Sequence, residues 1–181
     1  EGGFMAFDLF LLEKIASLRH PVLDSFFKFI TFWGSPMAFI SLGLIMMVVL
    51  IYKRNILGAI YLNLCLIVTW LIMSLLKDFF ARPRPSGEHL TIATGMSFPS
   101  GHAMLAMAFY GFIAYLLVQK FHSPKSRKLI WSLFLIFIFL IGFSRLYLNV
   151  HYPTDVMAGF GLGALFLYGF IKLYQRHRTH I

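Results

Sequence analysis

Segment 144–155 places an arginine, a histidine and a carboxylate beside a long apolar stretch that needs none of them. Pro153 favours the first turn of a new helix, which brings Asp155 close to the ring of His151. A carboxylate bonded to one ring nitrogen fixes the tautomer and leaves the other nitrogen free to attack an electrophile. The pattern therefore predicts a histidine nucleophile with its orienting acid. The alternative is that Arg145 extends to the lipid headgroups and His151 is an ordinary loop residue.

A second cluster, at residues 77–85, combines three basic side chains with two prolines. Lys77, Arg82 and Arg84 follow an apolar stretch, and the prolines prevent the helix from continuing. Arginine donates forked hydrogen bonds and lysine presents a compact charge, so such a group suits a phosphate. The alternative is a flank of basic residues that reach the membrane surface, as single lysines and arginines often do.

The third cluster, at residues 99–102, reads Pro-Ser-Gly-His and directly precedes an apolar helix. Ser100 is a suitable N-cap, and Gly101 and His102 then present free backbone N–H groups. A helix N-terminus of this kind binds anions through these donors and through the helix macrodipole. Capping alone would account for Ser100, but it leaves His102 without a function.

Together the three clusters supply a nucleophile, a second histidine and several anion-binding groups. The sequence offers no set of carboxylates suited to Mg²⁺ and no Cys/His quartet suited to Zn²⁺. We therefore expect phosphoryl transfer without a metal or other cofactor, in which positioning and charge stabilisation provide most of the catalysis.

The composition indicates the environment in which these clusters work. Hydrophobic residues make up 59% of the 181 residues and charged residues only 13%, which is more apolar side chain than a soluble domain of this size buries. The chain is therefore predicted to be an integral membrane protein. Its net charge of +9 does not indicate nucleic acid as a partner, because the basic residues gather in loops at one end of the apolar segments.

The apolar segments predict an all-α fold, a polytopic transmembrane helical bundle. Five of them are near the roughly 20 residues that a bilayer requires: 36–52, 56–76, 101–120, 129–148 and 154–174. We expect residues 36–181 to form the transmembrane core and residues 1–35 to form interfacial helices. Within 4–18, apolar residues at helical spacing leave Asp8 off the apolar face, which is typical of an amphipathic interfacial helix or of a helix that covers other spans. Residues 22–33 are expected to form a short interfacial or half-inserted helix.

The connections between these segments differ in charge. One side of the membrane receives basic residues and no acidic residue: Lys53, Arg54, Lys120, Lys125, Arg127, Lys128, Lys172, Arg176 and Arg178. The other side receives all seven acidic residues: Glu1, Asp8, Glu13, Asp24, Asp78, Glu88 and Asp155. The positive-inside rule predicts that the first side is cytoplasmic. The loop 77–100 and the region of His151 then share the extracytoplasmic face, so the three clusters can form one site.

At these residues the sequence resembles the type 2 phosphatidic acid phosphatase family, whose signature has three parts, K-x6-R-P, P-S-G-H and S-R-x5-H-x3-D. The matching residues are, in this order, Lys77, Arg84 and Pro85, then residues 99–102, then Ser144, Arg145, His151 and Asp155. A single short motif would be weak. Three motifs in the right order and on one membrane face are highly specific.

The resemblance implies a role for each matching residue. His151 would attack phosphorus and form a phosphohistidine intermediate, Asp155 would orient it, and His102 would protonate the leaving alkoxide and later activate water. The phosphate oxygens would be held by Lys77, Arg84, Ser100, Gly101 and Arg145. Arg82 falls outside the signature and is assigned only a potential headgroup contact. The implied fold has six spans, so either a further span precedes Glu1 or the N-terminal helices replace it.

We therefore expect an integral membrane lipid phosphate phosphatase of the bacterial plasma membrane, with its site on the extracytoplasmic face. Similar bacterial proteins act on phosphatidylglycerol phosphate, phosphatidic acid or undecaprenyl pyrophosphate, and the motifs do not separate these substrates. The alternatives are a lipid-phosphate binding or transport protein without turnover, and a phosphotransferase that uses an acceptor other than water. The presence of both His102 and His151 favours an enzyme, because binding needs cations but neither a nucleophile nor an acid.

Overall fold

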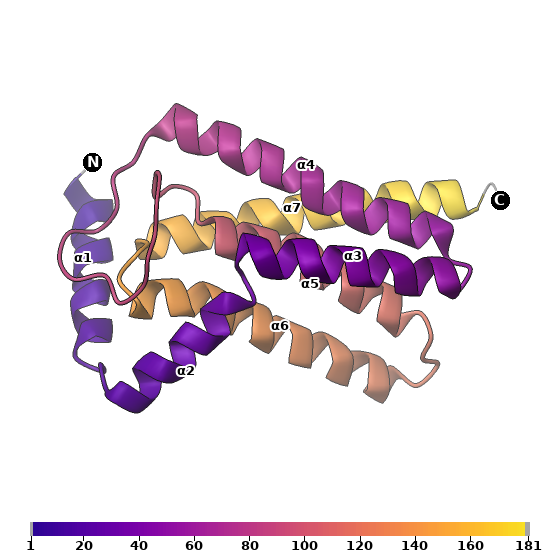
Figure 1. The fold of residues 1–181 in the computed structure, drawn as a ribbon, viewed down its shortest axis with the longest axis horizontal. Helices are drawn as coiled ribbons and strands as arrows, with labels where there is room; N and C mark the ends of the chain where they lie inside the picture. Colours follow the sequence, from indigo (N-terminus) through magenta and orange to yellow (C-terminus); the bar gives the residue numbers. More distant parts are fainter. Residues whose placement is uncertain (1, 180–181) are drawn as a thin grey trace.

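The computed structural model describes residues 2–179, and Glu1, for which the sequence predicted a membrane side, lies outside the described residues. Within this range the chain forms seven α-helices and no strand (Figure 1). They are α1 (Gly2–Ala16), α2 (Pro21–Phe32), α3 (Pro36–Tyr52), α4 (Ile56–Phe80), α5 (Gly101–Val118), α6 (Pro124–Tyr147) and α7 (Pro153–Arg178). The predicted all-α bundle is confirmed.

Helices α4 to α7 are each long and apolar enough to cross a membrane, and α2 with α3 passes the same test as a pair bent by 48°. By length and composition the described chain thus has four spans, or five if the bent pair is one broken span. With 17 residues, α3 is short for a bilayer by itself, and α2 supplies further apolar length. The bend is fixed at the start of α3, where Pro36 occupies the first turn and Ser35 accepts a hydrogen bond of 3.2 Å from the Ala38 N–H.

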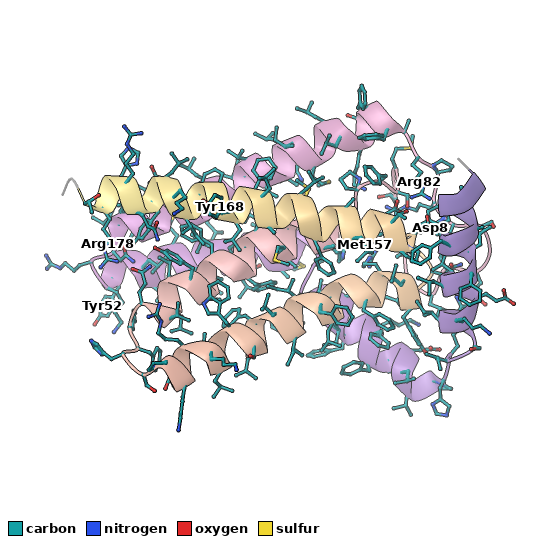
Figure 2. The ribbon with its side chains drawn as sticks, turned by 180° about the vertical axis from the view of Figure 1, so that it is seen from behind. Asp8, Tyr52, Arg82, Met157, Tyr168 and Arg178 are labelled. Atoms are coloured by element: carbon teal, nitrogen blue, oxygen red, sulfur yellow. The ribbon has the colours of Figure 1, made fainter. Side chains whose placement is uncertain are left out.

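The outer surface of the bundle is apolar. Met157 and Tyr168 on α7 are 63% and 62% exposed, and Figure 2 shows them on the outward side of that helix. Contiguous exposed apolar surface of this kind is rare on a protein in water. The chain is a multi-span membrane protein whose outer residues face lipid.

Helix α5 lies at the centre, with most of its residues buried and with α4, α6 and α7 packed around it. Lipid tails are as apolar as side chains, so spans associate mainly through close packing. On α7, a Cβ at Gly159 would approach the Ser100 carbonyl oxygen to 2.7 Å, and one at Gly163 would overlap the Met104 carbonyl oxygen. These two glycines therefore let α5 and α7 approach closely, which places the first turn of α5 beside the first turn of α7.

The two ends of the bundle differ chemically. The α3–α4 turn, the α5–α6 turn and the end of α7 lie at one end, and they carry the predicted basic residues. The loop 81–100, the α6–α7 turn and α1 lie at the other end, which we call the site end (Figure 1). In Figure 2, Asp8 and Arg82 mark the site end and Arg178 marks the basic end. The predicted meeting of the loop after α4 with the region of His151 is confirmed.

Helix α1 runs crosswise to the spans at the site end (Figure 1) and contacts α6 and α7. Asp8, which the sequence predicted to lie off the apolar face of this helix, is buried together with Leu12, whereas Phe7 on the apolar face is exposed. The cause is a partner that helical periodicity does not reveal: Arg82 lies 2.7 Å from the Asp8 carboxylate and holds it inward. The division of the chain at residue 35 stays a prediction.

Candidate active site

A cavity of about 510 Å³ opens at the site end of the bundle. Residues from all three predicted clusters line its polar part: Lys77, Arg84, Gly101, His102, Arg145 and His151. Its remaining wall is largely apolar and includes Phe39 and Ile40 of α3, Leu66, Ile67, Trp70 and Met73 of α4, and Leu105 of α5. The structure therefore brings the predicted cationic and histidine side chains together at one end of an apolar cavity.

His151 lies in the turn between α6 and α7, with 2% of its side chain exposed. Its Nδ1 is 3.4 Å from Asp155 Oδ2, and that oxygen also accepts a hydrogen bond of 2.9 Å from the Tyr152 N–H. Pro153 begins α7, so Asp155 falls in the first turn as predicted. Because a carboxylate can only accept, we assign the proton of the neutral imidazole to Nδ1, which leaves the lone pair on Nε2.

The surroundings keep the His151 ring uncharged. Burial lowers the pKa of His151 to about 3, against the opposing effect of its hydrogen bond with Asp155. The positive charges of Arg145, Arg84 and Lys77 lower this pKa further. Its Nε2 lies 3.3 Å from Arg84 Nη1. A neutral imidazole nitrogen beside a cation can attack an anionic ester whose charge that cation offsets.

Two of the cavity cations are tethered to the loop after α4. Lys77 Nζ donates a hydrogen bond of 2.6 Å to the Met96 carbonyl. Arg84 donates to four backbone carbonyls, those of Thr94 at 2.8 Å, Gly95 at 3.0 Å, Val150 at 2.6 Å and Met96 at 3.5 Å. These backbone acceptors are neutral, so they do not offset the positive charge of the two side chains at the cavity wall.

Arg145 and Ser100 each bury a polar atom without a partner among the described residues. Arg145 is 4% exposed at the end of α6. It donates a hydrogen bond of 2.6 Å to Thr31 Oγ1 on α2, while its Nε donates to nothing in residues 2–179. Ser100 occupies the predicted N-cap position of α5, but its hydroxyl makes no capping hydrogen bond. Buried donors left unpaired are costly, and an anion beside them would remove that cost.

His102 stands in the first turn of α5 and lines the same cavity as His151. Its ring packs against the break between α2 and α3, where a Cβ added at Gly34 would come within 2.6 Å of His102 Cδ2. Because residue 34 has no side chain, the His102 ring can occupy this position. Within residues 2–179 no group of three or more His, Cys, Asp or Glu side chains is arranged to hold a metal ion.

Residues 58–179, more than half of the chain, match the family model described as the PAP2 superfamily. The chain belongs to the PAP2 superfamily. Phosphatidylglycerophosphatase B of Bacillus subtilis is 33% identical over 174 aligned residues, which cover 92% of this chain and 85% of that protein. Lipid A 4'-phosphatase of Porphyromonas gingivalis is 29% identical over 187 aligned residues, which cover 93% of this chain and 74% of that protein.

A solved structure of the same family shares the fold. The crystal structure of a transmembrane PAP2 type phosphatidylglycerolphosphate phosphatase from Bacillus subtilis superposes with a TM-score of 0.88 at 30% identity, covering 95% of this chain and 86% of that chain. The family resemblance predicted from the three motifs is confirmed. This PAP2 chain is thus a membrane protein whose named relatives are phosphatases of lipid phosphates.

One residue that contacts the PAP2 signature was missed by reasoning from the sequence. The Ser97 hydroxyl donates a hydrogen bond to Asp155 Oδ2 and lies 3.3 Å from His151 Nδ1, and the side chain is fully buried. It therefore touches both members of the histidine–carboxylate pair. Ser97 stands in a loop, two residues before Pro99, and neither periodicity nor charge distinguishes it from an ordinary loop serine.

Arg82, outside the PAP2 signature, is paired with two carboxylates. It is absent from the residues that line the cavity. Its Nη1 is 2.6 Å from Asp155 Oδ1 and its Nη2 is 2.7 Å from Asp8 Oδ2, and the guanidinium stacks 4.1 Å above the Tyr152 ring. Burial alone would lower the pKa of Arg82, but hydrogen bonds to Asp8 and Asp155 and their charges raise it above its ordinary value. Arg82 thus contacts the carboxylate behind His151 and not the cavity.

Proposed function

We propose that this PAP2 protein hydrolyses a phosphomonoester or pyrophosphate lipid, through a phosphohistidine intermediate on His151. The observation that carries the proposal is a single cavity with two kinds of wall. One end holds two histidines and three cations, Lys77, Arg84, Arg145, His102 and His151. The rest is apolar and belongs largely to helices α3 and α4. Such a cavity suits a molecule with a phosphate at one end and a hydrocarbon chain at the other.

The outer edge of the cavity supports a substrate that arrives from the bilayer. Ile40, Ile67 and Trp70 line the cavity, yet they are 62%, 52% and 50% exposed. Side chains that face both the cavity and the lipid indicate an opening between α3 and α4. An acyl or isoprenyl chain can then stay in hydrocarbon while its phosphate reaches His151, which matters because each CH₂ withdrawn into water costs about 0.8 kcal/mol.

In the first step, the Nε2 lone pair of His151 attacks phosphorus and forms a P–N bond while the P–O bond to the lipid breaks. Asp155 accepts from Nδ1 and stabilises the positive charge that develops on the ring. His102 gives its proton to the departing oxygen, so that the lipid leaves as a neutral alcohol, or as a monophosphate when the substrate is a pyrophosphate. In this division of roles the nucleophile comes from the α6–α7 turn and the acid from α5, and both line the same cavity.

In the second step, His102, now neutral, takes a proton from water as the water oxygen attacks phosphorus. The P–N bond breaks, its electron pair returns to Nε2, and inorganic phosphate leaves. Lys77, Arg84 and Arg145 would hold the equatorial oxygens in both steps, with the free Ser100 hydroxyl and the Gly101 N–H as further donors. Such fixed charges lower the barrier because they need no rearrangement as negative charge builds on the phosphoryl oxygens.

We propose that this reaction needs no metal ion. Three cationic side chains line the cavity, and they would both repel a divalent cation and supply the positive charge that Mg²⁺ provides in other phosphoryl transfers. The charge difference between the two ends of the bundle supports a site on the extracytoplasmic face of the plasma membrane, because the basic residues lie at the opposite end.

Phosphate release by the purified protein tests the proposed reaction. The substrates are phosphatidylglycerol phosphate, phosphatidic acid and undecaprenyl pyrophosphate in detergent micelles, with His151→Ala as the matched control. We expect release from at least one lipid by the wild type and none above background by the variant. Binding of the lipids without release would favour a binding or transport protein, and activity retained in His151→Ala would exclude this nucleophile.

The same assay with EDTA and with vanadate tests the metal-free mechanism. Activity is expected to survive EDTA, and vanadate is expected to inhibit because it adopts a five-coordinate geometry like that of phosphorus during transfer. Loss of activity on chelation that Mg²⁺ or Zn²⁺ restores would contradict the mechanism.

A further inference from the structure

Asp8 is a fully buried carboxylate on a helix that lies outside the matched family segment 58–179. It accepts the Thr154 N–H at 2.9 Å, the Thr154 hydroxyl at 2.6 Å and Arg82 Nη2 at 2.7 Å. A carboxylate held by a backbone amide, a hydroxyl and a guanidinium has a fixed position. Figure 2 shows Asp8 on α1 beside Arg82 at the site end.

Arg82 joins this carboxylate to the one behind His151. Its Nη1 donates to Asp155 Oδ1 at 2.6 Å and to Thr154 Oγ1 at 2.8 Å, while its Nη2 donates to Asp8. The other oxygen of Asp155, Oδ2, takes the Ser97 hydroxyl and the Tyr152 N–H and faces His151. The two oxygens of Asp155 therefore differ in their partners: Oδ2 faces His151, and Oδ1, turned away from the histidine, is bound by Arg82.

We propose that Asp8 and Arg82 are positioning residues that fix the Asp155 carboxylate and, through it, the tautomer and direction of the His151 ring. Helix α1 is then a working part of the site and more than a cover for the bundle. This inference rests on the function proposed above, in which His151 is the nucleophile.

The charges explain why two residues are needed. A guanidinium paired with Asp155 alone would neutralise that carboxylate and weaken its hold on the Nδ1 proton. Asp8 shares the guanidinium charge, so the trio Asp8, Arg82 and Asp155 keeps one net negative charge facing His151. Arginine is also the only residue whose planar guanidinium can bond two carboxylates at fixed angles in this way.

The first test removes the negative charge of Asp8 while keeping the shape of its side chain. In Asp8→Asn we expect kcat to fall about 10- to 100-fold, which is typical when a reacting group is misaligned by a change outside it. KM is expected to stay within about twofold, because Lys77, Arg84 and Arg145 keep their places. Glu13→Gln on the exposed face of the same helix is the matched control and should keep the wild-type kcat.

The second test asks whether Asp8 acts through Arg82. Arg82→Lys keeps the charge but loses the fork, and we expect it to lower kcat by a similar factor. If both residues serve one relay, the double variant Asp8→Asn with Arg82→Lys should be no slower than the slower single variant. Losses that multiply would mean that the two residues act independently and would overturn the relay.

A spectroscopic readout separates this inference from the proposed function, because it needs no turnover. Histidine-selective ¹⁵N NMR of the full chain in detergent micelles reports the tautomer of His151, with His151→Asn identifying its signals. We expect one tautomer, with the proton on Nδ1, in the wild type and in Glu13→Gln, and averaged shifts in Asp8→Asn and Arg82→Lys. Wild-type protein without phosphatase activity would refute the function and leave this readout intact. Unchanged His151 shifts in both variants would overturn the positioning role.

Discussion

The N-terminal part of the chain and the segment matched by the family contribute to the site in different ways. Every titratable group that lines the cavity comes from residues 58–179. Residues 2–35 add only Gly34 to the cavity wall, yet Asp8, Thr31 and Gly34 each contact a side chain of the site or one directly behind it. Groups from residues 58–179 would thus act on the phosphate, whereas groups from residues 2–35 hold those groups in place.

The largest expected effect belongs to the first group. Arg145→Met removes a buried guanidinium from the cavity and keeps much of its length, so we expect kcat/KM for the lipid phosphate to fall about 10²- to 10³-fold, as is typical when one donor to a developing anion is lost. Inhibition by inorganic phosphate should weaken in parallel. Arg127→Met, at the exposed basic end, is the control and should change neither quantity. A fall of less than about threefold in Arg145→Met would remove Arg145 from the phosphate site.

A smaller effect is expected when only the support of this arginine is changed. Thr31 Oγ1 accepts from Arg145 Nη1 at 2.6 Å, and Thr31→Val removes that acceptor while keeping the shape. A hydrogen bond to a charged group contributes about 1.5 to 3 kcal/mol, and part of it is recovered when the arginine finds another acceptor, so we expect about a 10-fold loss of kcat/KM. Thr31→Ser keeps the hydroxyl and should retain most of the activity. Equal losses in both variants would point to packing and not to the hydrogen bond.

The same division explains what could be predicted from the sequence. The three motif clusters, the helical bundle and their meeting at one end were predicted because residue type and apolar length are local properties. The burial of Asp8 was not predicted, because its partner, Arg82, lies far along the chain and leaves no trace in the period of the helix. Thr31 and Ser97 were missed for the same reason, since a hydroxyl in an apolar segment or a loop gives no sign of which distant atom it bonds.

A still smaller effect on turnover is expected at Gly34. A methyl group there would meet the His102 ring and Ile141, each 2.6 Å from the added Cβ, so the ring or the Ile141 side chain must shift. We expect Gly34→Ala to lower kcat about threefold to 10-fold and to cost about 1–3 kcal/mol of stability, as overpacking usually does. Gly161→Ala is the matched control, because nothing lies within 4 Å of its added Cβ. A Gly34→Ala variant as active as Gly161→Ala would show that the ring is not confined from this side.

The smallest expected effect is on the protonation of His151, which depends on the burial of its ring and not on its positioning by α1. Burial lowers the pKa of His151 to about 3, in the presence of Asp155, Arg145, Arg84 and Lys77, whereas an unfolded chain binds this proton near pH 6.5. Between these values the unfolded state holds more protons, so this group destabilises the fold as the pH falls from about 6.5 towards 3.

The ¹⁵N shifts of His151 should therefore show no protonation between pH 7.5 and 5, where a free histidine peptide becomes about 97% protonated. Asp8→Asn should change the tautomer of this ring but leave it equally unprotonated, because a weaker bond to Asp155 removes an influence that raises the pKa of His151. Protonation near pH 6 in the variant alone would mean that α1 also keeps the ring buried. Protonation in the wild type would mean that water in the cavity keeps the pKa of His151 near its ordinary value. The bound phosphate would then have to control the charge of the nucleophile.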